Sequence, residues 1–137
     1  MTLELHATPE EVMRGVEALR EFAQINGVPE DSIFGLSLAL EECGSNIVNH
    51  ALQRDAGKKF LVAFDRTGDS FRIELCDAGP EFDPTAATIP KQQSDDDDQI
   101  GGWGIQLVRR YMNEIRYERR AGKNILRLTK RLAAPRP

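Results

Sequence analysis

The residues of this 137-residue chain that could do chemistry are densest between Glu41 and His50. Glu42, Asn46 and His50 stand at intervals of four, which places them on one face of a helix. Glu41 falls outside this spacing, so we expect Glu42 to be the carboxylate beside Asn46. A carboxylate at the edge of a buried face is poorly solvated and becomes a better base, and an Asn oxygen suits Mg²⁺ already held by phosphates. Taken alone, the stretch is more typical of the solvated edge of an amphipathic helix than of a functional site.

Two further segments carry residues suited to binding a nucleotide. Asp77 follows an apolar strand pattern, where a carboxylate can accept a hydrogen bond from an exocyclic amine, and Gly79 lets a flat ring approach the backbone. The segment Gly101-Gly102-Trp103-Gly104-Ile105 precedes a helical pattern, whose free N–H groups bind phosphate. The competing interpretations are an Asx turn at the end of the strand and a flexible connection. A zinc site at His50 is not expected, since no second His or Cys stands at a matching spacing.

The pattern of apolar residues predicts the elements that position these segments. Helical spacing follows the start signal Thr8-Pro9 and ends at Gly27, a second helix starts at Pro29, and a third carries Ile105, Val108 and Met112. Alternation with period two predicts strands near residues 3–5, 60–64, 71–75, 115–119 and 124–132. Residues 84–100, with the acidic run Asp95 to Asp98, show no clear period and are expected to form a loop.

This order of elements predicts an α/β two-layer sandwich, with a mixed, largely antiparallel sheet covered on one face by helices. We expect residues 1–132 to form a single domain and residues 133–137 a frayed tail. A net charge of −4 and a pI near 5.2 give no reason to expect nucleic-acid or membrane binding. Cys43 and Cys76 are isolated and resemble small buried residues of a reducing compartment, so a cytoplasmic location is expected.

Three segments in this order resemble the boxes of the GHKL ATPase superfamily, which has the Bergerat ATP-binding fold. The closest likeness is to its small bacterial anti-sigma factor/serine-protein kinases of the RsbW and SpoIIAB type. The N box is matched by Glu42-x-x-x-Asn46-x-x-x-His50, the G1 box by Asp77-x-Gly79-x-x-Phe82-Asp83, and the G2 box by Gly102-x-Gly104-Ile105-x-Leu107-Val108. The ending from Gly122 to Lys130 also matches. Each segment alone is weak, but the ordered set in so short a chain is specific.

The resemblance implies a role for each matching position. Glu42 would be the general base toward a substrate Ser or Thr hydroxyl, and Asn46 would ligate the Mg²⁺ that bridges the ATP phosphates. Asp77 would bind the adenine amino group, with Gly79 beside the ring and Thr129 supporting the pocket. The phosphates would be contacted by a larger set, namely Asn49, His50, Gly102, Gly104 and Ile105.

The resemblance also implies the activity: an ATP-dependent protein-serine/threonine kinase and anti-sigma regulatory factor of a partner-switching module. Its protein partners would be a STAS-domain anti-sigma antagonist as substrate, a sigma factor, and a second copy of the chain in a homodimer. Two alternatives stay open. One is a non-catalytic, nucleotide-dependent regulatory module, which the acidic run Asp95 to Asp98 favours because it would repel a triphosphate. The other, less favoured, is a catalytic domain that phosphorylates a histidine in trans.

Overall fold

The computed structural model describes residues 1–86 and 105–132. Its labelled elements, in chain order, are β1 (Thr2–His6), α1 (Pro9–Ile25), α2 (Glu30–Asn46), the π-helix η1 (Ile47–Ala51), β2 (Lys59–Thr67), β3 (Ser70–Asp77), β4 (Glu114–Arg120) and β5 (Lys123–Arg131). A further helix covers residues 105–111. The predicted strands and helices are all present, and only the π-helix was not expected. Within the described ranges, no helix is both long enough and apolar enough to cross a membrane.

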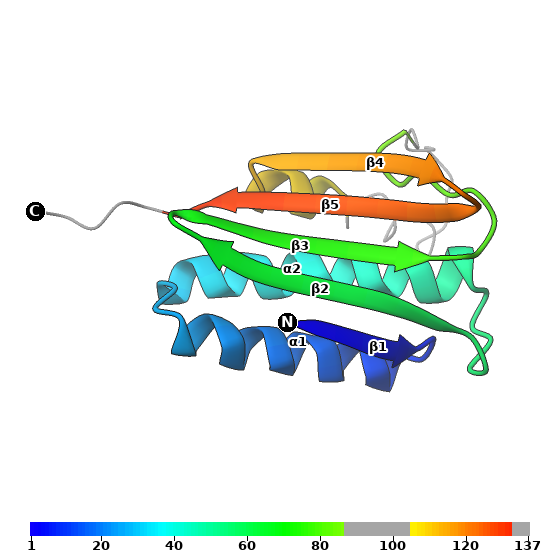
Figure 1. Cartoon of the computed structure of the whole chain (residues 1–137), viewed down its shortest axis with the longest axis horizontal. Coiled ribbons are helices and arrows are strands. Elements are labelled where there is room, and N and C mark those ends of the chain that lie inside the picture. Colours follow the sequence, from blue (N-terminus) through cyan, green and yellow to red (C-terminus); the bar gives the residue numbers. More distant parts are fainter. Residues whose placement is uncertain (87–104, 133–137) are drawn as a thin grey trace, which may run out of the picture.

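The five strands form one sheet in the order β1-β2-β3-β5-β4. Every strand pair that the structure describes is antiparallel, so the predicted largely antiparallel sheet is confirmed, while none of these pairs is parallel as a mixed sheet would require. The two long helices lie side by side on one face of the sheet, and no helix of the described residues lies on the opposite face (Figure 1). The predicted two-layer α/β sandwich is therefore confirmed.

The core lies between the helices and the covered face of the sheet. Period-two alternation sends one set of side chains from β2 and β3 inward, and these residues are almost fully buried: Phe60, Val62, Phe64, Phe71, Ile73 and Leu75. The helices contribute residues at spacings of three and four, among them Leu19, Ile33, Leu36 and Leu40. Burying one such side chain contributes about 1.5–3 kcal/mol. The same inward alternation places Asp77, the last residue of β3, on the covered face beside the end of α2.

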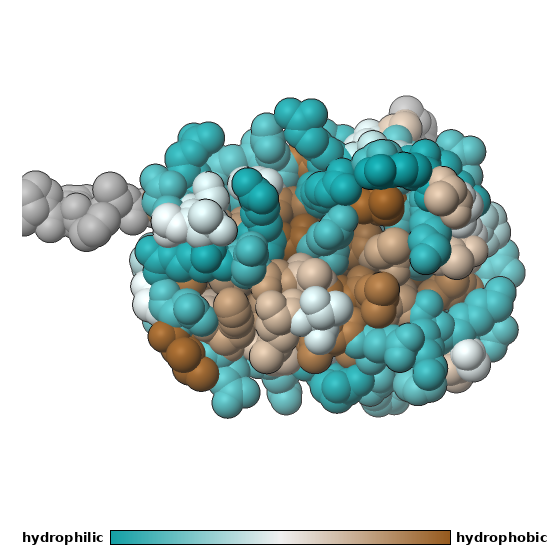
Figure 2. All heavy atoms as spheres, in the orientation of Figure 1, coloured by the Kyte–Doolittle hydropathy of each residue, from teal (hydrophilic) through white to brown (hydrophobic). Residues whose placement is uncertain are grey.

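The uncovered face of the sheet is mostly hydrophilic, with apolar groups visible between the charged rows (Figure 2). Ion pairs cross this face between strands: Arg127 of β5 pairs with Glu74 of β3 at 3.2 Å and with Glu118 of β4 at 3.0 Å. Exposed pairs of this kind contribute little to the free energy of folding. Their arrangement is that of a solvated face.

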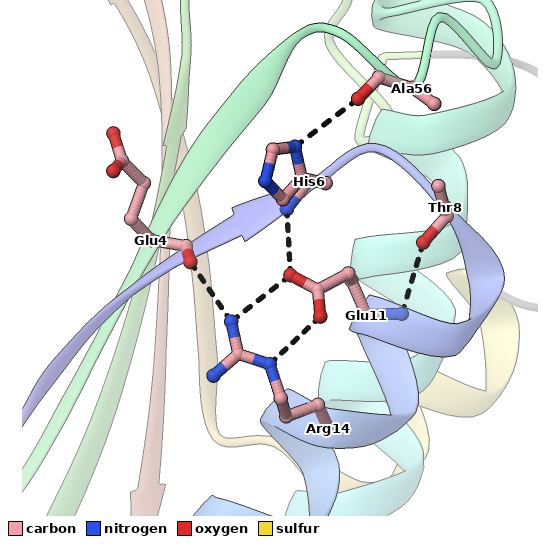
Figure 3. A network of polar contacts seen from close by, with 6 residues as sticks. All are labelled: Glu4, His6, Thr8, Glu11, Arg14 and Ala56. Atoms are coloured by element: carbon pink, nitrogen blue, oxygen red, sulfur yellow. Dashed lines mark hydrogen bonds and ion pairs between the residues drawn. The ribbon is translucent and has the colours of Figure 1, made fainter.

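A polar network joins β1 to the start of α1 (Figure 3). Thr8 caps α1, because its hydroxyl accepts the Glu11 N–H at 3.2 Å. The Glu11 carboxylate accepts two hydrogen bonds from Arg14, at 2.8 and 3.0 Å, and one from the His6 N–H at 3.0 Å. Arg14 also donates to the Glu4 carbonyl at 3.2 Å. The hydrogen bonds from Arg14 and from the His6 backbone lower the pKa of Glu11 from 4.5 to about 2.

Glu11→Gln is expected to lower the thermal midpoint at pH 7 by about 1–3 °C, since it keeps the shape of the side chain and removes its charge. The lowered pKa of Glu11 means that the ionised carboxylate stabilises the folded state fully above pH 4.5. This contribution is lost as the pH falls from 4.5 toward 2, so the two melting curves should converge there. Calorimetry of both proteins from pH 7 to pH 2 measures this, with Glu10→Gln as control. A difference that does not depend on pH would contradict the argument.

Candidate functional site

The end of α2 brings two of the predicted residues together. Glu42 and Asn46 lie one helical turn apart, and both are half-buried. Burial raises the pKa of Glu42 above its ordinary value, and the neighbouring charge of Glu41 raises it further. This is the direction that a general base requires. The structure thus gives Glu42 the environment that the helix spacing predicts.

Beyond Asn46 the helix does not continue as an α-helix. Residues Ile47–Ala51 form the π-helix η1, in which the Leu52 N–H donates to the Ile47 carbonyl at 2.8 Å, five residues back. π-helices are rare and are frequent at functional sites. The wider turn moves His50 away from the line that an α-helix would give it. Its exposed ring stacks on Phe82, with 5.3 Å between ring centroids, so His50 lies over the segment that follows β3.

The connection after η1 has an unusual backbone. Gln53 and Arg54 both adopt positive φ angles, 53° and 59°, which cost non-glycine residues of order 1–2 kcal/mol each. Arg54 Nε donates to the side-chain oxygen of Asn49 at 2.9 Å. The strained turn therefore places a guanidinium beside Asn49, one of the residues expected to line the phosphates.

Asp77 is a buried acceptor, 5% exposed, at the end of β3. Its Oδ1 accepts the Gly79 N–H at 2.8 Å and the Asn124 amide at 2.9 Å. The first of these bonds forms the Asx turn that competes with the ligand site as an interpretation of the sequence. Asp77 can form this turn and still belong to a ligand site. Among the described residues, no group donates to Oδ2 of Asp77. A buried carboxylate oxygen without a partner is costly, and it is the atom expected to accept an amine.

A small cavity lies between α2 and the sheet beside Asp77. Its volume is about 20 Å³, and it is lined by Cys43, Asn46, Ile47, Leu75, Asp77, Phe82, Pro84, Tyr117, Asn124 and Leu126. Such a volume holds about one water molecule. A purine base is larger than this volume, so the lining residues must separate before one can enter. The cavity nevertheless joins Asn46 of the N box to Asp77 of the G1 box, as the resemblance implies.

The fit to Mg²⁺ rests on Asn46. Within residues 1–86 and 105–132, no group of three His, Cys, Asp or Glu side chains is placed to hold a metal ion by itself. Asn46 lines the cavity, and its side-chain amide makes no hydrogen bond to another described residue. Mg²⁺ commonly takes one or two protein oxygens and completes its shell with water and phosphates. A single free amide oxygen therefore fits an ion that arrives with a nucleotide.

Asn124 is a site residue that sequence reasoning missed. It is 4% exposed and stands opposite Asp77 in the β3–β5 register. Its amide joins the end of β3 to the following segment, because it donates both to Asp77 and to the Pro80 carbonyl, each at 2.9 Å. The signal was present, since Asn124 belongs to the matching C-terminal segment and an Asn in an apolar strand needs buried partners.

Thr129 does not lie at this site. It is five residues from Asn124 along β5, and an odd spacing puts two strand side chains on opposite faces of the sheet. Thr129 instead lines a groove of about 480 Å³ on the uncovered face, with Met1, Arg72 and Glu114. We therefore do not carry the expected adenine role of Thr129 into the proposed site.

The expected phosphate-binding glycines Gly102 and Gly104, and the run Asp95 to Asp98, lie outside the described residues. Ile105 is described: it is 5% exposed and begins the helix at 105–111, where it packs into the core. The described residues thus bring together Glu42, Asn46 and Asp77.

Gly79 is needed for close packing. A Cβ atom at this position would lie 2.5 Å from the Ala51 carbonyl oxygen of η1, a backbone atom that cannot turn away. We expect Gly79→Ala to lower the free energy of unfolding by about 2–3 kcal/mol, because the clash separates η1 from the end of β3. Chemical denaturation measures this. Gly57→Ala serves as a control at an exposed glycine, where the nearest atom would be 3.4 Å away. Equal free energies of unfolding for wild type and Gly79→Ala would show that the segment around Gly79 can move to accommodate the added methyl group.

Comparisons with known proteins agree with this geometry. Residues 5–130 match the family described as the histidine kinase-like ATPase domain. The serine/threonine-protein kinase BtrW of Bordetella bronchiseptica is 36% identical over 97 residues, which cover 70% of this chain and 68% of that protein. The serine-protein kinase RsbW of Listeria innocua is 27% identical over 121 residues, covering 85% of this chain and 77% of that protein.

Two solved structures resemble the whole fold. The structure of the RsbU and RsbW domains of a Mycobacterium tuberculosis protein aligns with a TM-score of 0.70 and 25% identity, over 98% of this chain. This chain spans only 33% of the length of that one. A chain in the SiaB–SiaC complex of Pseudomonas aeruginosa aligns with a TM-score of 0.67 over 94% of this chain and 88% of that chain; its 14% identity shows the fold alone. With Asn46 and Asp77 lining one cavity and a match over residues 5–130, this chain belongs to the histidine kinase-like ATPase domain family.

Proposed function

We propose that this chain is an ATP-dependent protein-serine/threonine kinase and anti-sigma regulatory factor of a partner-switching module. The observation that carries the proposal is a buried acceptor at Asp77 and a free amide at Asn46 on one cavity, with a half-buried carboxylate of raised pKa, Glu42, one helical turn before Asn46. The names of the relatives, serine- and serine/threonine-protein kinases, support the choice of substrate residue.

In the proposed reaction each residue has one task. Oδ2 of Asp77 accepts a hydrogen bond from the exocyclic amine of adenine. Asn46 ligates Mg²⁺, and when bound this ion neutralises and orients the phosphates. Phosphoryl transfer then depends chiefly on positioning and on an oriented nucleophile. Glu42 takes the proton of the substrate hydroxyl while the oxygen of that hydroxyl bonds to the γ-phosphorus. ADP leaves with the electron pair of the broken P–O bond.

The remaining proposed contacts lie toward the phosphates. Asn49 and His50 are exposed on η1, where Asn49 accepts a hydrogen bond from Arg54 of the strained turn and His50 stacks on Phe82, which lines the cavity. Gly102 and Gly104 are proposed to supply backbone N–H donors, as their match to the G2 box implies. Ile105 supports this segment by anchoring the following helix in the core.

The proposed partner is a STAS-domain anti-sigma antagonist, which carries the phosphorylated Ser or Thr. Sequestration of a sigma factor by a homodimer, in the cytoplasm, completes the proposed module. The solved complex of SiaB with SiaC supports a protein partner for a chain of this fold. The two cysteines of the chain are free, which agrees with a reducing compartment.

A second candidate function is a non-catalytic binding module. The small cavity beside Asp77 favours it, because a volume of about 20 Å³ does not hold a purine base. The two candidates differ in whether the partner becomes modified.

Incubation of the chain with Mg²⁺, γ-³²P-labelled ATP and the STAS-domain proteins of the source genome tests the proposal. A kinase of this class transfers label to Ser or Thr, giving a phosphate that survives acid. Acid-labile label would identify the histidine-directed alternative. Binding of ATP and of a STAS partner without any transfer would select the non-catalytic module.

A further inference from the structure

The amide of Asn124 has only one possible orientation. Its oxygen accepts three hydrogen bonds: from the Tyr117 hydroxyl at 2.5 Å, from Arg119 Nη1 at 3.1 Å and from the Phe82 N–H at 3.1 Å. Rotating the amide by 180° would set its NH₂ group against the Phe82 N–H and Arg119, which can only donate, and would turn its oxygen toward the acceptors of Asp77 and Pro80. Because the residue is 4% exposed, water could not replace the lost partners. The NH₂ group must therefore face Asp77 and the Pro80 carbonyl.

This fixed orientation acts directly on Asp77. Oδ1 of Asp77 receives the Asn124 amide and the Gly79 N–H, two donors that together occupy it. Oδ2 remains the free acceptor beside the cavity. A carboxylate held by two donors stays in place and presents an acceptor, not a donor, to any ligand.

Arg119 connects Asn124 to the segment that follows β3. Its Nη1 also donates to the Gly79 carbonyl at 2.8 Å, so one guanidinium group contacts both Asn124 and the turn that Asp77 caps. Two of the three donors to the Asn124 oxygen therefore come from the edge strand β4, and the third is the Phe82 N–H. Tyr117 is half-buried and Arg119 is exposed, and both belong to the inner face of this strand, opposite Leu126 and Asn124.

We infer that Asn124, locked by Tyr117 and Arg119, is a positioning residue that makes the site select a 6-amino purine over a 6-oxo purine. The inference rests on the proposed nucleotide-binding function and adds the determinant of its base selectivity. An amine donates to the fixed Oδ2 of Asp77, whereas a 6-oxo group meets it acceptor to acceptor. Sites that hydrogen-bond a polar group of the substrate discriminate strongly against analogues that lack it.

The test compares the affinities of ATP and inosine triphosphate, which differ in the 6-substituent of the base and in the proton that this places on N1. Asn124→Asp keeps the acceptor for Tyr117, Arg119 and Phe82 but removes the donor to Asp77. Like charges about 2.9 Å apart then force Asp77 to turn or to take up a proton. By calorimetric titration we expect ATP affinity to fall at least about tenfold, inosine triphosphate affinity to stay within about twofold, and the affinity ratio to fall about tenfold.

An affinity ratio that is unchanged in a folded Asn124→Asp protein would overturn the inference. So would a wild-type protein that binds both nucleotides equally well. A wild-type protein that binds neither would instead overturn the proposed function, which keeps the two failures distinct.

Tyr117→Phe is the second variant, for use even if Asn124→Asp does not fold. It removes one of the three donors and leaves the ring in place, so the affinity ratio should fall about threefold with little change in thermal midpoint. Glu118→Gln, on the uncovered face of the same strand, is the matched control and should keep the wild-type ratio. If Tyr117→Phe had the same ratio of ATP to inosine triphosphate affinity as this control, the inferred role of Tyr117 in holding Asn124 would be contradicted.

Discussion

Replacing Asp77 by Asn is expected to weaken ATP binding at least about 100-fold while leaving the fold intact. The substitution preserves shape, and its oxygen can still accept the Gly79 N–H and the Asn124 amide. The NH₂ group then replaces Oδ2, so an amine of the base meets a donor where it needs an acceptor. The loss combines a charge-assisted hydrogen bond with a donor left unpaired in a buried site.

Calorimetric titration with ATP and ADP, with and without Mg²⁺, measures this effect. Asp65→Asn is the matched control, since it makes the same chemical change at an exposed position on the uncovered face of the sheet. Circular dichroism and the thermal midpoint establish that both variants are folded. Equal ATP affinities for wild type and Asp77→Asn would remove Asp77 from the proposed base-binding role.

The part of the fold that the sequence predicts well is the part set by local periodicity. Strands and helices follow from alternation in segments such as 60–64 and 71–75 and from start signals such as Thr8-Pro9. The two-layer architecture then follows, because only one face of the sheet is apolar. Local periodicity could not predict that none of the described strand pairs is parallel, since strand pairing depends on contacts between residues far apart in sequence. The strand order, in which β5 lies between β3 and β4, depends on such contacts as well.

The site was predictable where one element carries its residues. Glu42 and Asn46 lie on one helix, so their spacing sufficed. Asn124 escaped because its role depends on the antiparallel register that sets it opposite Asp77. Thr129 was expected at the pocket from the resemblance alone, without regard to the alternation of side chains along β5. It lies five residues from Asn124, and this odd spacing puts its side chain on the opposite face of the sheet. The π-helix η1 has no sequence signal at this level, since its extra residue is held by tertiary contacts such as Gly79 against Ala51.

The general-base role of Glu42 predicts a large effect on phosphate transfer and none on ATP binding. Glu42→Gln keeps the size of the side chain but cannot accept the substrate proton. Loss of general-base catalysis is expected to slow transfer to the STAS-domain partner by about 10²–10⁴-fold, with ATP affinity within about twofold of wild type. Single-turnover transfer of γ-³²P label measures the rate, and calorimetry measures the affinity. Transfer at the wild-type rate would exclude Glu42 as the base.

The pH dependence of transfer separates Glu42 from its neighbour Glu41. Only the ionised carboxylate of Glu42 accepts a proton, so transfer should rise with pH through the raised pKa of Glu42 and then level off. The Glu41 charge contributes to that raised pKa, after burial. Glu41→Gln should therefore retain transfer and shift the midpoint of the pH–rate curve to lower pH. If Glu41→Gln instead abolished transfer while Glu42→Gln did not, the base would be Glu41, and the helix spacing that selects Glu42 would have chosen the wrong carboxylate.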